Sequence, residues 1–245
     1  MKKIILALLL LLAVPLLSKE KPRLHICTTA SDWDPGVDKL LRSCKENHLN
    51  VEIFGLGEPF SFDRKLGHCQ SFISNLPDDD VVMYVDAYDI LILASEDRIL
   101  DEFFKMEASI VFSVEPTCYP FPQVGPYYPK SPTRYRYLNS GSYIGYVKDL
   151  KRVFAEMMPI PEETDDQGLF LIYHLYYPER FHLDHYCKLF LTLRQTRESE
   201  IYIDPIEKNV KCLLTGTTPC IVHGNGREGR IIYHKIYDQL FPAKN

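Results

Sequence analysis

Five consecutive apolar residues, Val81–Val85, stand between a run of three aspartates and a fourth aspartate, Asp86. A run this short and this apolar is typical of a strand that is buried on both faces, as in the centre of a parallel sheet. Parallel strands need crossover connections, which are usually helices. The chain is therefore constrained to an α/β fold, with Asp86 at the point where the strand ends.

The segments on either side of this run alternate between strand-like and helix-like patterns. Strands are expected at residues 24–28, 51–54, 81–85, 109–114 and 142–147, with weaker ones at 200–203 and 220–223. Helices are expected at residues 37–48, 64–76, 96–105, 149–158 and 166–176, and a loop rich in Pro, Tyr and Phe at 115–137. This order predicts a single-domain α/β fold, with a Rossmann-type, mostly parallel sheet flanked by helices. Ligands bind such sheets at the carboxyl ends of the strands.

The composition allows one substantial core and argues against nucleic acid as a partner. The chain has 245 residues, of which 46% are hydrophobic, and this is enough for one sizeable α/β domain. Acidic residues outnumber basic ones by 33 to 28, and the net charge is −5. Lys and Arg form no dense stripe of the kind that follows a phosphodiester backbone. We therefore expect no nucleic-acid partner.

A basic amino-terminus is followed by an almost unbroken apolar run at residues 4–17. This pattern is typical of an export signal. The run is shorter than the roughly 20 apolar residues of a membrane span. A cleaved signal peptide at residues 1–18 is favoured over a short signal anchor, so we expect no stable membrane span and a mature domain at residues 19–245.

Seven cysteines lie beyond this leader, and none of them forms a CxxC pair or a zinc-ligand spacing. A structural zinc site is therefore not expected. An odd number leaves at least one thiol unpaired or paired with another chain. The pairing of the others stays open.

Asp86 and Asp89 lie three residues apart directly after the buried strand. A turning backbone can aim both carboxylates at one point in the ligand crevice. Carboxylate oxygens suit Mg²⁺ or Mn²⁺, hard cations that keep positions open for phosphate oxygens. An ordinary surface turn uses Asp as well, so the pair alone leaves both interpretations open.

His223 and Asn225 follow a second strand-like pair of apolar residues, with Gly224 and Gly226 between and after them. The imidazole is a suitable third metal ligand, and the glycines permit a ligand to approach the backbone closely. A histidine in a glycine-rich turn is the plain alternative.

Two further polar groups suit contacts with a sugar. Asn139 precedes the expected strand at 142–147, where its amide can bond to hydroxyl groups, although an ordinary turn would look the same. Asp165 and Asp166 open the helical pattern at 166–176. Acids in a first helical turn also serve as caps, so a structural role and a catalytic role both remain open.

Six motifs in order carry a resemblance to a known family. They are LHIC at 24–27, GLGE at 55–58, VDAYD at 85–89, LNSG at 138–141, DDQ at 165–167 and VHGNG at 222–226. In these motifs the chain resembles the glycosyltransferase domain of the lysyl hydroxylase/procollagen glycosyltransferase family, a PLOD-like domain of the GT-A type. The resemblance covers most of the mature chain.

The resemblance implies roles for individual residues. In that family the two aspartates of the DxxD element and the histidine of HGNG bind Mn²⁺, which implies the same for Asp86, Asp89 and His223. It further implies that Asn139, Asp165 and Asp166 face the donor sugar and the acceptor as the catalytic group. The residues that it implies for binding the nucleotide and its phosphates are Thr28 or Thr29, Lys65, Tyr88, Asn225 and Gly226.

The chain also departs from the family pattern near these pockets. The acidic run before Gln167 is shorter than in the family, and so is the region between Phe60 and Lys65. Two tryptophans of the family correspond here to Phe60 and Tyr119. These changes leave the sugar open.

The expected function is therefore that of a Mn²⁺-dependent enzyme that transfers a hexose from UDP-glucose or UDP-galactose to a hydroxyl group. The resemblance implies a protein or glycan acceptor, with collagen-like hydroxylysine or galactosyl-hydroxylysine as the family's own. One alternative is a secreted protein that binds a nucleotide sugar or glycan with little turnover. A metal-dependent phosphohydrolase is a third interpretation, but it needs a denser cluster for two metals. An export signal implies the secretory pathway, in the endoplasmic reticulum or Golgi lumen or outside the cell, or the periplasm of a bacterium.

Overall fold

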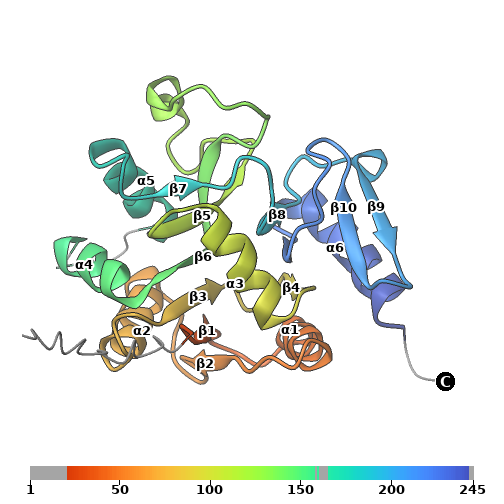
Figure 1. The fold of residues 1–245 in the computed structure, drawn as a ribbon, viewed down its shortest axis with the longest axis horizontal. Coiled ribbons are helices and arrows are strands. Elements are labelled where there is room, and N and C mark those ends of the chain that lie inside the picture. The colour runs from red at the N-terminus through yellow and green to blue at the C-terminus, as the bar shows by residue number, and fades with distance from the viewer. Residues whose placement is uncertain (1–20, 158, 160–164, 243–245) are drawn as a thin grey trace, which may run out of the picture.

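The computed structural model describes residues 21–157, 159 and 165–242. A six-stranded sheet with the order β2-β1-β3-β6-β5-β7 forms its centre (Figure 1). The bounds of these strands are Glu52–Phe54, Leu24–Thr29, Val81–Val85, Tyr137–Tyr146, Ile110–Glu115 and His182–Leu183, in that order across the sheet. The expected leader at residues 1–18 and the last residue of the helix expected at 149–158 lie outside the described residues.

Five of the six strands run in one direction. β1 is parallel to β2 and β3, and β5 is parallel to β7. β6 lies between β3 and β5 and is antiparallel to both. The expected mostly parallel sheet is therefore confirmed, with one inserted antiparallel strand that carries Asn139 toward the carboxyl end of β3.

Both faces of the sheet are covered, as the apolar pattern of β3 requires. Val82 and Tyr84 point into one cluster with α2 (Phe62–Ser74), α4 (Val147–Met157) and α5 (Asp166–Tyr176). Val81, Met83 and Val85 point into another with α1 (Pro35–Glu46) and α3 (Glu96–Lys105). This alternation follows from the period of two in a strand.

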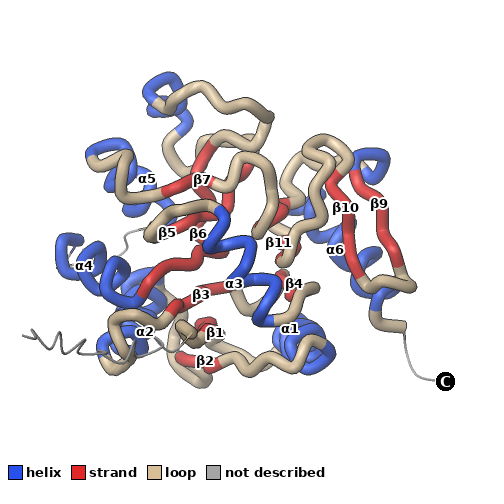
Figure 2. The backbone as a smooth tube through the Cα atoms, in the orientation of Figure 1, coloured by secondary structure: helices blue, strands red, loops and turns tan. Residues whose placement is uncertain are grey.

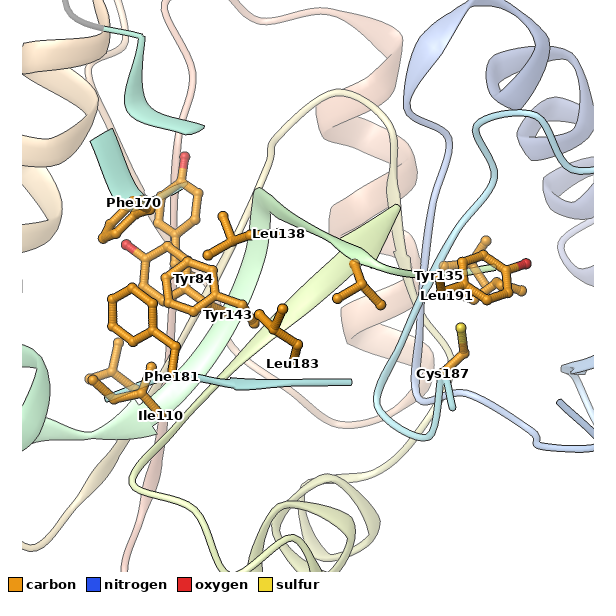
Figure 3. Packing of buried hydrophobic residues seen from close by; sticks show 14 of the residues in the cluster. Tyr84, Ile110, Tyr135, Leu138, Tyr143, Phe170, Phe181, Leu183, Cys187 and Leu191 are labelled. Carbon is orange, nitrogen blue, oxygen red and sulfur yellow. The ribbon is translucent and has the colours of Figure 1, made fainter. Parts of the chain in front are cut away.

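Aromatic side chains fill the first cluster around Tyr143 of β6 (Figure 3). The ring of Tyr143 stacks on Tyr84 at 5.2 Å and on Phe112 at 4.9 Å between centroids. Phe112 also contacts Phe170 of α5 and Phe181, at 5.0 and 4.5 Å. These rings fix α5, and therefore its amino-terminal acids, against the sheet.

A second, three-stranded sheet with the order β4-β11-β8 carries His223. Its strands are Ile90–Ile92, Ile221–His223 and Phe190–Thr192, in that order. β11 is antiparallel to β4 with His223 opposite Ile90, and it is parallel to β8. Because β4 begins directly after Asp89, this pairing brings His223 beside the acidic turn.

The carboxyl-terminal part adds a hairpin and a long helix (Figure 2). Strands β9 (Ile201–Asp204) and β10 (Asn209–Cys212) pair antiparallel, and α6 (Gly226–Leu240) contacts β9. Two short 3-10 helices lie at Pro122–Tyr127 and Glu198–Glu200. β4, β7, β8, β10 and α6 were not expected from the sequence. Strands of two to four residues show little period, so β2, β9 and β11 were expected and four others of similar length were not. The glycines before α6 suggest a loop.

Among the described helices, none is both long and apolar enough to cross a bilayer.

Candidate functional site

The acidic turn after β3 is held in place by its neighbours. The backbone N–H of Asp86 donates to the carbonyl oxygen of Gly141 at 2.8 Å, which ties the turn to β6. A Cβ atom at Gly36 of α1 would lie 2.2 Å from the carbonyl oxygen of Tyr88, so this glycine lets α1 pack directly on the turn. The turn therefore has contacts with backbone on two sides.

Asp86, Asp89 and His223 form one cluster. Nε2 of His223 lies 3.3 Å from Oδ1 of Asp89 and 3.7 Å from Oδ2 of Asp86. One ligand atom from each of the three residues lies within 4.8 Å of the other two. Donor atoms at roughly 2.0–2.2 Å from one octahedral cation have such separations, and two carboxylates with one imidazole suit Mn²⁺ or Mg²⁺. The residues present thus fit a divalent cation.

Gly141 makes room for this cluster. A Cβ atom at this position would lie 2.2 Å from Cε1 of His223 and 2.7 Å from Oδ2 of Asp86. Real Cβ atoms do not approach neighbours this closely. The glycine of the LNSG motif is therefore needed for the two side chains to meet.

The charges of the cluster are strongly coupled. Burial lowers the pKa of His223, but Asp89 and Asp86 outweigh it, so the pKa lies above its ordinary value. Burial raises the pKa of Asp86, which stays above its usual value although Lys65 and His223 oppose the shift. Burial also acts to raise the pKa of Asp89, but His223 outweighs it and the pKa is lowered. Each carboxylate of the cluster thus has a basic neighbour, Lys65 for Asp86 and His223 for Asp89.

Lys65 of α2 bridges two acids in this structure. Its Nζ atom lies 2.8 Å from Oδ1 of Asp86 and 2.7 Å from Oδ2 of Asp166. Burial alone would lower the pKa of Lys65, but these carboxylates raise it well above its usual value. The ammonium group is therefore charged and lies between the candidate metal ligands and the start of α5.

The two acids at the start of α5 differ in their surroundings. Asp165 is the amino-terminal cap, and its Oδ1 accepts a hydrogen bond from the backbone N–H of Gly168 at 2.8 Å. Asp166 is buried beside Lys65. Both line the same cavity as Asn139, so the structure brings all three of the expected catalytic residues together.

A cavity of about 300 Å³ lies at the carboxyl ends of β1 and β3. Its lining includes Thr29, Lys65 and Tyr88. The Tyr88 hydroxyl accepts hydrogen bonds from the backbone N–H groups of Ser31 and Asp32, at 3.0 and 3.2 Å. The hydroxyl oxygens of Thr28 and Thr29 are buried and have no hydrogen-bond partner among the described residues.

A neighbouring cavity of about 220 Å³ adjoins the first, and the two share the lining residues Phe62, Lys65, Asp86 and Asp89. Asn225 and Gly226 also line it, at the amino-terminus of α6. A helix amino-terminus favours phosphate groups. The candidate cation site therefore lies where the first cavity, near β1, adjoins the second, near α5.

Sequence reasoning missed Glu115 and Arg194, which also line the second cavity. Nε of Arg194 lies 3.5 Å from Oε2 of Glu115, and its guanidinium carbon lies 5.7 Å from the centroid of the Tyr119 ring. Glu115 ends β5 and is followed by proline, a pattern that is typical of the start of a loop. The strand-end position was the one available signal.

Comparison with known proteins identifies similar chains. A family model described as "PLOD GT domain" matches residues 20–233. The "Multifunctional procollagen lysine hydroxylase and glycosyltransferase" of Caenorhabditis elegans is 29% identical over 227 residues, which cover 84% of this chain and 30% of that protein. "Procollagen-lysine,2-oxoglutarate 5-dioxygenase 1" of Mus musculus is 28% identical over 226 residues, covering 85% and 31%. The chain spans about a third of the length of these relatives.

One solved structure is similar over nearly its whole length. It is that of a glycosyltransferase involved in the glycosylation of the major capsid of PBCV-1, with a TM-score of 0.50 and 13% identity. The match covers 87% of this chain and 99% of that chain. At this identity the likeness concerns the fold alone, and it confirms the expected GT-A-like α/β architecture.

Proposed function

The chain belongs to the PLOD GT domain family, and from that premise we propose that it transfers a hexose from a UDP-sugar to a hydroxyl group with the help of Mn²⁺. The observation that carries this proposal is the convergence of Asp86, Asp89 and His223 on one point. Asp86 and Asp89 lie in the turn between β3 and β4, and His223 ends β11. The two aspartates line both cavities, and His223 lines the second.

In the proposed reaction Asp86, Asp89 and His223 hold the cation. Mn²⁺ bound there supplies positive charge that offsets the negative charge of the departing diphosphate. Asn225 and Gly226 present the amino-terminus of α6 to the phosphate groups, where helix N–H groups favour an anion. Lys65 adds a second positive charge beside Asp86.

The first cavity is proposed to hold the nucleoside. Tyr88 offers its ring as one wall, and its hydroxyl is fixed by the backbone of residues 31 and 32. The unpartnered hydroxyl of Thr29, which lines this cavity, suits a polar ligand, because a buried hydroxyl without a partner costs about 1–3 kcal/mol. Thr28 is fully buried and lines neither of the two cavities, so Thr29 is the threonine proposed to contact the nucleotide. UDP-glucose and UDP-galactose are the proposed donors.

The second cavity is proposed to hold the sugar and the acceptor hydroxyl. Asp165 is partly exposed, and it lies near enough to the cavity to orient a hydroxyl group or accept its proton. Asp166 is paired with Lys65 and is proposed to hold that ammonium group in place. A collagen-like hydroxylysine or galactosyl-hydroxylysine, or another protein or glycan hydroxyl, is the proposed acceptor.

We propose that the protein is exported, because residues 1–18 have the pattern of an export signal. A compartment that contains nucleotide sugars, such as the lumen of the endoplasmic reticulum or Golgi, would supply the donor. Mass spectrometry of the amino-terminus of the secreted protein tests the cleavage, and an uncleaved leader would contradict it.

The function is tested by UDP release from UDP-glucose and UDP-galactose with Mn²⁺. The wild-type protein should release UDP continuously, and Asp89→Ala should be slower by on the order of 10²-fold. Asp97→Ala is the matched control, because Asp97 is an exposed acid paired with Lys21. Binding of a UDP-sugar without release of UDP would instead support a binding protein with little turnover, and equal rates in wild type and Asp89→Ala would contradict the metal assignment.

A further inference from the structure

We propose that Asn139 is a positioning residue for His223. Its side-chain oxygen accepts a hydrogen bond from Nδ1 of the imidazole, which directs the Nε2 lone pair toward Asp86 and Asp89. The buried carboxylate of Glu115 in turn fixes the Asn139 amide by accepting a hydrogen bond from its NH₂ group. The inference rests on the proposed metal site. It assigns Asn139 an action through another residue, in place of the direct sugar contact that the motif alone suggested.

The orientation of the Asn139 amide is set by partners that have a single hydrogen-bonding role. The backbone N–H of Gly141 lies 3.1 Å from one end of the amide. An N–H group only donates, so this end is the oxygen, Oδ1. The carboxylate of Glu115 lies 3.3 Å from the other end. An ionised carboxylate only accepts, so that end is the NH₂ group.

This orientation decides which ring nitrogen of His223 carries the proton when the imidazole is neutral. Nδ1 of His223 lies 3.2 Å from the same Oδ1. Since Oδ1 only accepts, Nδ1 must carry a proton for the two atoms to bond. With its proton on Nδ1, a neutral imidazole carries its lone pair on Nε2, the atom that lies 3.3 Å from Asp89 and 3.7 Å from Asp86. A bond at one ring nitrogen commonly fixes the metal-binding role of the other.

The bond also fixes the direction of the ring. Rotation of the imidazole by half a turn would remove Nδ1 from Oδ1, and it would leave Oδ1 facing a C–H group. His223 is 4% exposed, and Gly141 lies against its Cε1 atom without room for a Cβ. Packing therefore confines the ring to its plane, and the hydrogen bond to Oδ1 selects one of the two orientations within it.

Glu115 acts through its partners because its oxygens are already engaged. Oε1 accepts from Asn139 at 3.3 Å and from Gln167 at 2.8 Å. Oε2 accepts from Thr117 at 2.9 Å and from Asn225 at 3.3 Å, and Arg194 lies 3.5 Å from it. The residue is 1% exposed. A carboxylate surrounded in this way orders the amides around it and has no oxygen left for a substrate.

Asn139 is similarly committed. Its NH₂ group also donates to Oε1 of Gln167 at 3.1 Å, and its Oδ1 also accepts from the Ser113 hydroxyl at 3.1 Å. The side chain is 4% exposed. Its polar atoms are therefore used inside the protein, which is expected of a residue that holds another in place.

The experiment measures the Mn²⁺ dissociation constant by calorimetry in four proteins. Asn139→Leu removes the acceptor for Nδ1 and should raise the constant by about 10- to 100-fold, the usual effect of losing such a partner. The double variant Glu115→Gln with Asn139→Asp exchanges the two groups, so that an amide at position 115 donates and a carboxylate at position 139 accepts from Nδ1. It keeps the total charge, but the amide of Gln167 must turn over to bond with both exchanged groups, so we expect Mn²⁺ binding within about tenfold of wild type.

Thr117→Val is the matched control. It removes one hydrogen bond to Oε2 of Glu115 without touching Asn139. We expect a dissociation constant within about twofold of wild type. Nitrogen-15 NMR of the Mg²⁺-saturated protein provides a second readout, in which the Nδ1 proton of His223 should exchange slowly in wild type and in the double variant, and rapidly in Asn139→Leu.

The outcomes separate this inference from the proposed function. If wild type and Asn139→Leu have the same Mn²⁺ dissociation constant and a slowly exchanging Nδ1 proton, the positioning role is wrong. The metal site would then still stand. Failure of the wild type to bind Mn²⁺ would overturn the metal site and the inference together. If Asn139→Leu does not fold, the double variant decides, because a loss of affinity above tenfold in it contradicts the inference.

Discussion

The ammonium group of Lys65 lies 2.7 Å from the carboxylate of Asp166, and both side chains are more than nine-tenths buried. The same ammonium lies 2.8 Å from Asp86. One cation thus offsets two acids at the bottom of the site, which makes the start of α5 dependent on α2.

Lys65→Met should therefore be strongly destabilising. It leaves Asp166 and Asp86 without their counter-charge, and removing one partner of a buried pair costs about 3–5 kcal/mol. Urea unfolding of the metal-free proteins measures this difference. Lys105→Met is the matched control, because the Lys105–Glu102 pair lies on an exposed helix surface, where solvent screens an ion pair and its loss should hardly change the free energy of unfolding. Similar losses in both variants would contradict the proposed importance of burial.

Gly141→Ala should disable the cation site. The added methyl group would overlap His223 and Asp86, so the two ligands must separate. We expect Mn²⁺ affinity to fall by at least about tenfold, as measured by calorimetry. Gly67→Ala serves as the control, since a Cβ there meets nothing within 4 Å and Ala favours a helix. Undiminished Mn²⁺ binding by Gly141→Ala would refute the packing argument.

Asp184→Ala should destabilise the connection between β7 and β8. The buried carboxylate accepts hydrogen bonds from the backbone N–H groups of Lys188, Leu189 and Phe190, at 3.0, 2.7 and 2.9 Å. Two buried donors and one partly buried donor without acceptors should cost about 3 kcal/mol. Asp204→Ala removes a similar cap of two N–H groups from an exposed turn, and it should cost less than half as much. Thermal unfolding of the two variants gives the comparison.

His174 predicts a dependence of stability on pH. Burial, with a smaller effect of His185, lowers its pKa from 6.5 to about 4. Below about pH 6.5 the unfolded chain binds a proton that the folded protein excludes. The free energy of unfolding should therefore fall as the pH drops from about 6.5 to about 4, by about 3 kcal/mol from this residue. Above about pH 6.5 this contribution is constant.

His174→Phe isolates this effect from the carboxylates that titrate in the same range. Phe keeps the contacts with Tyr128 and Phe181 and has no proton to bind. The stability of the variant relative to wild type should rise as the pH falls through this window, as measured by urea unfolding at several pH values. A difference that stays constant with pH would show that His174 does not titrate in this way.

Much of the framework was predictable because the strands around Asp86 have a clear period and clear ends. The apolar run at Val81–Val85 predicted a doubly covered strand, and the structure places it between two clusters. The meeting of Asp86 and His223 followed from the order of motifs, whereas the strand pairing that produces it did not. A strand was expected at β11 but not at β4, and strands of three residues are too short for their pattern to specify a partner.

The polar contacts inside the site were not predictable from the sequence. The pairing of Lys65 with Asp166 depends on how α2 and α5 pack, and a helical pattern does not specify its partner. Glu115 gave no signal beyond its place at a strand end, since one glutamate before a proline is common in loops. Its role depends on amides from three other segments, which only the tertiary structure brings together.

The turn that carries Asp86 and Asp89 also connects the two sheets. Its first acid follows the six-stranded sheet, and its second precedes β4 of the three-stranded one, whose neighbour β11 supplies His223. An ion that binds all three side chains would therefore link the two sheets. Metal binding should therefore hold the two sheets in a fixed relation to each other, so that the residues proposed for the chemistry also join the two sheets.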